Sequence, residues 1–183
     1  KKNIIIATGG TGGHIFPAVS LANNLIKEGF NLTLTTDIRG LKFFDDNIKK
    51  YTKVIKSSPL LKKKISVSVL KIIFAIFESL IFLNKKRPKF IFGMGGYSSF
   101  PVCFAAMVLR IPFLIYENNL TMGKANRFLT PFAKKIFVSY QDIDGIKKKY
   151  EKKIVVIGNI LREEIFSRSG KKEKNEKDLN ILV

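Results

Sequence analysis

The sequence of 183 residues has few of the side chains that build disulfide frameworks and metal centres, with one cysteine and one histidine. A lone cysteine, Cys103, excludes an internal disulfide and fits a reducing cytoplasm. Because there is no carboxylate pair and no cluster of cysteine and histidine, we expect no bound metal. An initiator methionine is also lacking and an apolar strand follows directly, so we expect a trimmed start and no signal peptide.

Acidic residues are scarce as well, since 14 of them stand against 33 lysines and arginines, giving a formal net charge of +19. This charge favours an anionic partner: nucleic acid, an acidic membrane surface or a phosphorylated substrate. A general lysine bias is the alternative. Nucleic-acid modules usually add aromatic platforms or arginine base readers. Neither motif occurs here, so nucleic acid is not a predicted partner.

The most informative stretch that is present is the glycine-rich turn at residues 9–17, GGTGGHIFP, between an apolar strand and an apolar helical face. Such a turn brings backbone N–H groups and a helix N-terminus onto an anion. A turn that only needs positive φ would use fewer glycines. Ile15 departs from the dinucleotide fingerprint, and the lysine of a Walker loop is missing. Asp37, after the second strand, is weak evidence for a ribose contact. We therefore predict a ligand-binding loop outside the nicotinamide dehydrogenases.

Strands and helices alternate along the chain, which predicts an α/β fold, a Rossmann-like parallel sheet with helices on both faces. We expect strands at 3–7, 31–36, 53–56, 89–92, 112–116, 135–139 and 154–157, and helices at 17–28, 65–83, 101–109, 122–131 and 142–150. The expected domains are 1–168, a charged linker at 169–178, and the start of a truncated second domain at 179–183.

Four turns rich in glycine or polar residues follow apolar strands, at 9–14, 93–97, 117–119 and 158–162. Ligands of parallel sheets bind beyond the carboxyl ends of the strands, so these turns should converge on one rim. Two glycine turns on one rim suit a diphosphate better than a single phosphate.

In order and spacing these motifs resemble the MurG family, the peripheral-membrane N-acetylglucosaminyltransferases of peptidoglycan synthesis. The resemblance covers roughly residues 1–168 and rests on GGTGGH at 9–14, GGYSS at 95–99, ENN at 117–119, and GN at 158–159 with Arg162. Tyr116, Asn118 and Ile160 depart from the family pattern, which usually has His, Gln and Pro there.

The resemblance implies the amino-terminal, acceptor-side half of a two-domain GT-B glycosyltransferase without a bound metal or cofactor. The family transfers N-acetylglucosamine, with inversion, from UDP-GlcNAc to the muramoyl 4-hydroxyl of lipid I, a polyprenyl-diphosphate-linked muramoyl peptide, and so makes lipid II. It acts peripherally on the cytoplasmic side of the bacterial plasma membrane. The donor pocket lies mostly in a C-terminal domain, so this chain alone should be inactive. The alternatives are another UDP-sugar GT-B transferase with a different acceptor and a basic module that binds nucleic acid or membrane.

A sugar hydroxyl is a poor nucleophile, so its attack benefits from a positioned base of near-neutral pKa. His14, with an unperturbed pKa of about 6.5, is suited to that task, and a structural bond to the loop is its alternative. Glu117 is a competing base, a group that orients the base, or a helix cap. The resemblance assigns donor contacts to Thr11, Gly12, Gly13, Asn119 and Arg162, and acceptor-diphosphate contacts to Gly95, Gly96 and Tyr97. Arg162 as a surface cation and Tyr97 as a packing residue are the alternatives.

The apolar helix at 65–83 has about 19 residues, which at about 1.5 Å each nearly span a bilayer core. Lys71 and Glu78, however, would each cost about 3 kcal/mol or more at its centre. They form one polar stripe with Ser68, Ala75 and Ser79. We therefore predict an amphipathic helix docked on anionic inner-leaflet lipid, with a fully buried core helix as the alternative. The expected membrane contacts are Lys64, Lys71, Phe74, Phe77 and Lys85.

Overall fold

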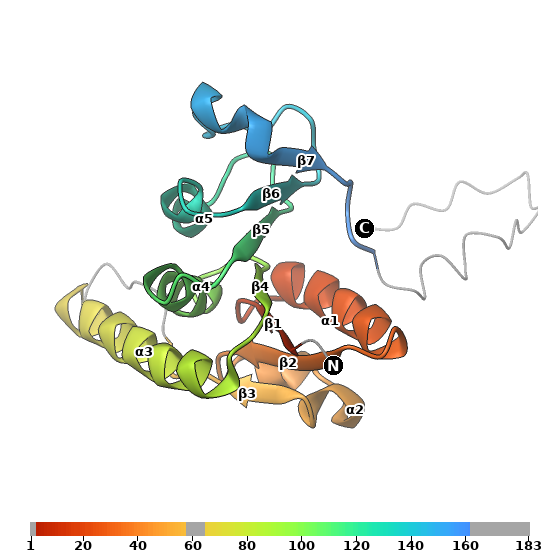
Figure 1. Ribbon diagram of the computed structural model, residues 1–183, viewed down its shortest axis with the longest axis vertical. Coiled ribbons are helices and arrows are strands. Elements are labelled where there is room, and N and C mark those ends of the chain that lie inside the picture. The colour runs from red at the N-terminus through yellow and green to blue at the C-terminus, as the bar shows by residue number, and fades with distance from the viewer. Residues whose placement is uncertain (1–2, 58–64, 162–183) are drawn as a thin grey trace, which may run out of the picture.

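The computed structural model describes residues 3–57 and 65–161 (Figure 1). Seven strands form one parallel sheet in the order β3-β2-β1-β4-β5-β6-β7. The strands are β1 (Asn3–Ala7), β2 (Asn31–Thr36), β3 (Thr52–Val54), β4 (Phe90–Gly93), β5 (Phe113–Glu117), β6 (Lys135–Val138) and β7 (Ile154–Val156). The predicted Rossmann-like fold is confirmed. The predictions for the linker, the second domain, Lys64 and Arg162 lie outside the described residues.

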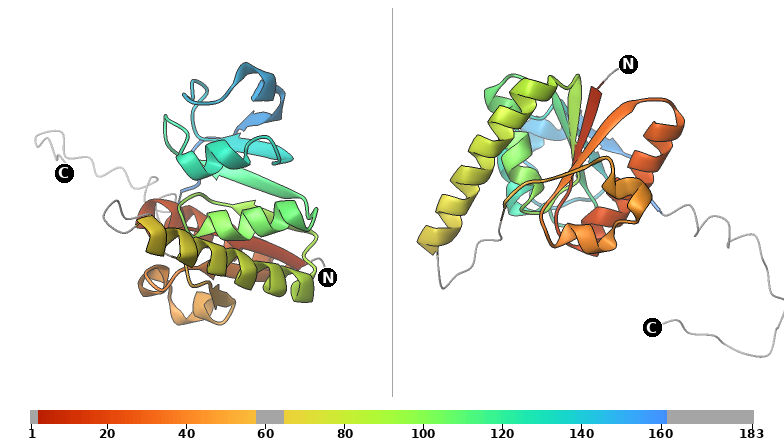
Figure 2. Two further views of the ribbon diagram at one scale, coloured as in Figure 1. Left: turned by 90° about the vertical axis from the view of Figure 1, so that its left-hand side faces the viewer. Right: turned by 90° about the horizontal axis from the view of Figure 1, so that it is seen from below.

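Helices cover both faces of the sheet, because each strand alternates its apolar side chains between them. In β1, Ile4 and Ile6 enter one core cluster, and Ile5 and Ala7 enter the other. The first cluster lies under α1 (Gly12–Lys27), with η1 (Gly40–Phe43) and α2 (Asp46–Lys49) nearby. The second lies under α3 (Ile65–Lys86), α4 (Ser99–Val108) and α5 (Lys124–Leu129), which share one side of the sheet (Figures 1 and 2).

Helix α3 packs along α4 and turns its small residues inward. Ser68, Ala75 and Ser79 of the predicted polar stripe are buried, and Glu78 forms an ion pair with Lys53 at 2.9 Å. The large apolar side chains point outward instead, which contradicts the fully buried alternative. We call this surface the α3 outer face: Leu70 (56% exposed), Ile73 (55%), Phe74 (72%), Phe77 (62%) and Ile81 (58%). Within residues 3–57 and 65–161, none of the helices combines the length and apolarity needed to cross a bilayer.

Two helix predictions need correction. Helix α1 begins at Gly12, inside the glycine turn, and not at Pro17. Most of the helix expected at 142–150 is a loop, followed by the short 3-10 helix η3 (Lys148–Lys153). The loop pairs with the segment after β5: Met122 donates to the Asp144 carbonyl at 2.9 Å, and Asp144 donates to the Leu120 carbonyl at 2.8 Å. These bonds, with φ +88° at Gly145, replace the helical pattern.

Cys103 lies on α4 and is fully buried against the sheet. A Cβ added at Gly93 of β4 would lie 2.6 Å from its Sγ, so the thiol is tightly enclosed. Burial raises the pKa of this thiol to about 12. Cys103 therefore acts as a small apolar core residue.

Candidate functional site

The two glycine turns meet at the switch point of the sheet, where β1 pairs with β2 on one side and with β4 on the other. A Cβ on Gly9 would lie 2.9 Å from the Gly96 Cα, which leaves no space for a side chain. Gly96 also adopts φ +79°, a conformation that favours glycine. Direct backbone contact thus brings the first two motifs onto one rim, as predicted.

His14 lies in the first turn of α1 with its imidazole against the second glycine turn. A Cβ added at Gly95 would lie 2.9 Å from the His14 Cε1, and one added at Gly96 would lie 3.2 Å from the His14 Cδ2. Burial lowers the pKa of His14 below its ordinary 6.5, although the Glu117 charge and the Met94 backbone act in the opposite direction. Nδ1 is buried without a hydrogen-bond partner among the described residues. The imidazole is therefore neutral near pH 7 and is able to accept a proton.

Glu117 ends β5, is 2% exposed, and has both carboxylate oxygens occupied. Oε1 accepts from the Asn119 backbone at 3.2 Å and from the Asn119 side chain at 2.6 Å. Oε2 accepts from the Gly123 backbone at 2.9 Å and from Asn126 Nδ2 at 3.0 Å. These bonds fix the loop that enters α5, where Gly123 is the N-cap. The geometry favours a positioning role for Glu117 over proton transfer.

Asn118 joins the turn at 117–119 to the glycine turn at 9–14. It does so by bonding the Gly13 carbonyl, which Pro17 leaves without a helical donor. Pro17 was expected in the first turn of the helix, but in the structure it lies inside α1. Because proline has no N–H, the carbonyl four residues earlier, that of Gly13, loses its helical donor. Asn118 Nδ2 donates to this carbonyl at 2.9 Å. The side chain that departs from the family's usual glutamine thus holds the start of α1.

A cavity of about 280 Å³ opens between these motifs. It is lined by His14, Gly96, Tyr97, Glu117, Asn119, Gly123, Lys124, Ala125 and Asn126. Tyr97 is 45% exposed, which argues against a plain packing role. Sequence reasoning missed Lys124 and Asn126, which lie in the first turn of α5. Their place directly after the Glu117 turn was the signal that could have found them.

The described residues that the resemblance assigns to the donor lie mostly on the open side of the rim. Thr11, Gly13 and Asn119 are exposed, and Gly12 is half-buried. The first turn of α1 contains no acidic residue, so the positive potential of its N-terminus is retained. This is the arrangement expected for one wall of a cleft that receives an anionic ligand.

The fourth motif is tied to this rim by Tyr116, which is 2% exposed. Its hydroxyl lies 2.8 Å from Ser139 Oγ and donates to the Gly158 carbonyl at 3.3 Å. It also accepts from the Ile160 N–H at 3.2 Å. Tyr116 therefore holds the segment after β7 near the end of β5.

Asp37 is a structural residue and is not free for a ribose contact. Arg39 donates through Nε at 3.1 Å and Ser98 Oγ donates at 2.6 Å to Asp37 Oδ2. Burial would raise the pKa of Asp37, but these bonds and the Arg39 charge bring it below the ordinary 3.8. Across the part of the chain that the structure describes, no group of three or more histidine, cysteine, aspartate or glutamate side chains could hold a metal ion.

A parallel sheet with a glycine-rich rim at its switch point defines a Rossmann-like domain, and its structural neighbours are GT-B glycosyltransferases and epimerases. The structure is similar to MurG from Acinetobacter baumannii, with a TM-score of 0.69 and 25% identity over 85% of this chain and 45% of that one. It has the fold of a UDP-GlcNAc 2-epimerase from Methanocaldococcus jannaschii, with a TM-score of 0.63 and 19% identity over 87% of this chain and 46% of that one.

The Glycosyltransferase family 28 N-terminal domain matches residues 4–138, and the chain belongs to this family. A relative from Rickettsia felis, 38% identical over 100% of this chain and 51% of its own length, is a UDP-N-acetylglucosamine–N-acetylmuramyl-(pentapeptide) pyrophosphoryl-undecaprenol N-acetylglucosamine transferase. A relative of the same name from Rickettsia rickettsii (strain Sheila Smith) is 39% identical over 90% of this chain and 43% of its own length. The chain thus spans about half the length of the curated relatives it matches.

Proposed function

We propose that this chain is the acceptor-side domain of an inverting glycosyltransferase that moves N-acetylglucosamine from UDP-GlcNAc to lipid I and so forms lipid II. Whole-chain identity to transferases of that name supports the donor, the acceptor and a carboxyl-terminal half that completes the donor pocket. The observation that carries the proposal is the neutral His14 imidazole, held against paired glycine turns in a cavity of about 280 Å³.

His14 is the proposed general base. The muramoyl 4-hydroxyl oxygen forms a bond to the anomeric carbon of the donor while the bond from that carbon to the UDP oxygen breaks. The hydroxyl proton passes to the imidazole, and UDP leaves as the anion. The lowered pKa of His14 keeps the imidazole unprotonated near neutral pH. Glu117 acts as a positioning residue, because its oxygens already accept bonds from Asn119, Gly123 and Asn126.

The acceptor diphosphate is proposed to lie at the second glycine turn. Gly96 and Tyr97 line the same cavity as His14, and the adjacent Lys124 supplies a positive charge. Gly95 supports the imidazole from behind. An acceptor held there would present its sugar hydroxyl to His14, which is the positioning that catalysis needs.

The α3 outer face is proposed to dock the enzyme on acidic inner-leaflet lipid, on the cytoplasmic side of the plasma membrane. Phe74 and Phe77 are exposed apolar anchors, with Lys71 on the helix and Lys85 at its end, both exposed. Aromatic groups that enter the headgroup region and lysines near anionic lipid both stabilise such binding. Peripheral docking would bring the rim close to a membrane-borne acceptor.

The test joins this chain to the carboxyl-terminal half of the Rickettsia felis relative and measures transfer from UDP-GlcNAc to a polyprenyl-diphosphate-linked muramoyl peptide. We expect transfer by the joined protein. The chain alone should bind UDP-GlcNAc no more tightly than about millimolar, or about −4 kcal/mol, because it forms one wall of the cleft.

The control acceptor is the same muramoyl peptide without its lipid diphosphate, which should react poorly. Transfer to a different acceptor only would favour another UDP-sugar transferase. Equal affinity for any polyanion, lost with salt, would favour a basic binding module.

A further inference from the structure

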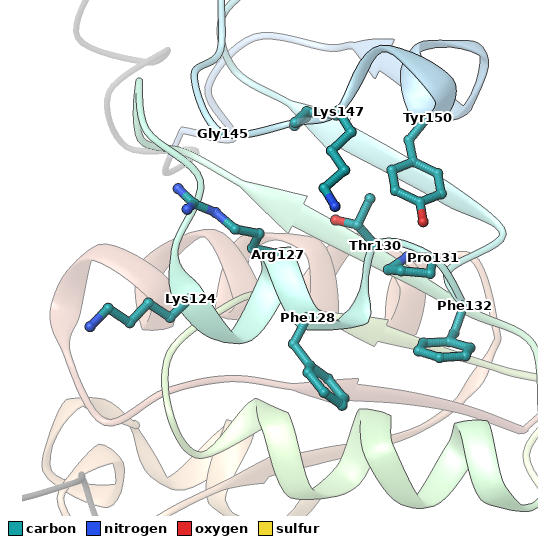
Figure 3. A pocket seen from close by; sticks show the side chains of 10 residues that line it. Lys124, Arg127, Phe128, Thr130, Pro131, Phe132, Gly145, Lys147 and Tyr150 are labelled. Carbon is teal, nitrogen blue, oxygen red and sulfur yellow. The ribbon is translucent and has the colours of Figure 1, made fainter.

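A second cavity lies between α5 and the segment at 145–150, and has a volume of about 770 Å³ (Figure 3). We call it the α5 groove. It is lined by Lys124, Arg127, Phe128, Thr130, Pro131, Phe132, Gly145, Ile146, Lys147 and Tyr150. Small-molecule sites typically measure about 300–1,000 Å³, so the groove is large enough for a hydrocarbon chain.

The groove combines cationic and aromatic side chains (Figure 3). Lys124 and Arg127 lie at one end, whereas Phe132 and Tyr150 lie toward the other, where the Lys147 side chain also reaches in beside Thr130. No acidic residue is in the lining, and Lys124, Arg127 and Lys147 form no ion pair within residues 3–57 and 65–161. Unpaired cations beside an apolar trough are complementary to a ligand with an anionic head and a hydrocarbon tail.

The groove connects the proposed active site to the helical face of the domain. Lys124 lines both the groove and the cavity that contains His14. Farther along, the Phe128 ring packs at 5.6 Å from that of Phe100 on α4 and at 6.4 Å from that of Phe132. Helices α3, α4 and α5 lie side by side on this side of the sheet (Figure 2). A chain that leaves the His14 cavity past Lys124 would therefore run along the partly exposed aromatic side chains of Phe128 and Phe132.

We propose that the α5 groove binds the isoprenoid segment next to the diphosphate of the acceptor, with Lys124 and Arg127 contacting that diphosphate. The inference rests on the proposed function for the identity of the acceptor. It adds a place for the lipid chain that neither the glycine turns nor the α3 outer face provides. The head group is held by charge-assisted contacts, and the tail by apolar burial against Phe128 and Phe132.

The test uses the 183-residue chain and two soluble probes, farnesyl diphosphate and inorganic diphosphate, with affinity measured by calorimetry. If the groove holds the hydrocarbon, farnesyl diphosphate binds at least about tenfold more tightly, because partial burial of a few isoprenoid carbons is sufficient for that gain. Equal affinity for the two probes would overturn the proposal.

Matched variants locate the site. Phe132→Ala should weaken farnesyl diphosphate binding about fivefold and leave inorganic diphosphate unchanged, whereas Phe74→Ala, on the α3 outer face, should change neither. Arg127→Ala should weaken both probes about tenfold, and Lys152→Ala, outside the groove, should weaken neither. Thermal unfolding checks that each variant is folded. Farnesyl diphosphate affinity that is unchanged in Phe132→Ala but falls in Phe74→Ala would place the hydrocarbon outside the groove and refute the proposal.

The same variants separate this inference from the proposed function. If farnesyl diphosphate binding depends on Phe132 but the joined protein transfers no sugar to the muramoyl acceptor, the groove is supported and the proposed function fails. If transfer occurs and farnesyl diphosphate binding is indifferent to Phe132 and Arg127, the proposed function is supported and the groove is refuted.

Discussion

The rim around His14 and the α3 outer face are built on the same sheet but differ in where their side chains make contacts. At the rim, backbones touch at Gly9 and Gly96, and the buried carboxylate of Glu117 is hydrogen-bonded inside the domain. On α3, small side chains face inward while Phe74 and Phe77 face outward. The rim is therefore specified by contacts within the chain, whereas the outer face is suited to contacts with something outside it. Mutations should affect stability or catalysis at the rim, and association at the α3 outer face.

The largest effect is expected where the two glycine turns touch. Gly96→Ala would place a Cβ 2.7 Å from the Gly9 Cα, so unfolding free energy should fall by about 3 kcal/mol or more. Gly29→Ala is the matched control, because Gly29 has nearly the same φ, +78°, and no atom within 4 Å of its Cβ position. It should cost about 1 kcal/mol, from backbone strain alone. Urea denaturation measures both, and equal losses would show that contact between the turns is unimportant.

His14→Ala should alter catalysis without altering membrane association. In the joined protein we expect turnover to fall about 10²-fold, the usual contribution of a general base, while binding to acidic vesicles is unchanged. Since burial lowers the pKa of His14, the acidic limb of its rate profile should lie below pH 6.5 and be missing in the variant. Near-normal turnover in a folded variant would remove His14 from the mechanism.

A double replacement, Phe74→Ser with Phe77→Ser, should weaken membrane association without altering the chemistry at His14. Co-sedimentation with acidic vesicles should weaken about tenfold or more through lost apolar burial, with thermal stability unchanged. Binding should also need acidic lipid and weaken with salt, because lysines near the surface contribute about 1 kcal/mol each. Ile38→Ser, at a site 70% exposed but outside α3, is the control. If it weakens binding as much as the double variant, the docking surface lies elsewhere.

An effect confined to acidic pH is expected at Asp37, which ties the end of β2 to Ser98 before α4. Its pKa is lowered in the folded state, so it stabilises the fold above the unfolded value of about 3.8. That contribution should be lost as the pH falls through the lower folded-state pKa, at a cost of about 1.5 kcal/mol. Asp37→Asn should flatten this part of the stability curve in urea titrations at pH 2–5. An unchanged curve would show that Asp37 is not responsible for acid sensitivity.

Much of this arrangement was predictable from sequence. Strands β1 and β2 have the predicted limits because the apolar run of β1 and the alternating leucines and threonines of β2 are both followed by polar residues. The meeting of the glycine turns followed from parallel topology. The turns at 9–14, 93–97 and 117–119 all supply residues to the His14 cavity. Asn118 bonds the first of them, and Tyr116 holds the fourth turn, at 158–162, through the Gly158 carbonyl.

The failures have physical causes that a linear pattern does not contain. The early start of α1 depends on Asn118 donating to the Gly13 carbonyl across the sheet. The loop at 142–147 depends on backbone bonds from Asp144 and Met122. The helical spacing of the polar and small residues on α3 could be recognised in the sequence. Which side of the helix faces inward is determined by its packing against α4.

The enclosed thiol on α4 has a practical consequence. Thiolate is the reactive form of cysteine, and at ordinary pH almost none exists at Cys103, whose pKa is raised to about 12. The Cys103 thiol is therefore unreactive toward maleimides and mild oxidants unless the fold opens. A single cysteine introduced at the position of Phe77, Phe132 or Tyr97 would be the one site labelled. Spectroscopic probes could then report separately on the outer face, the groove and the rim, without first removing the native cysteine.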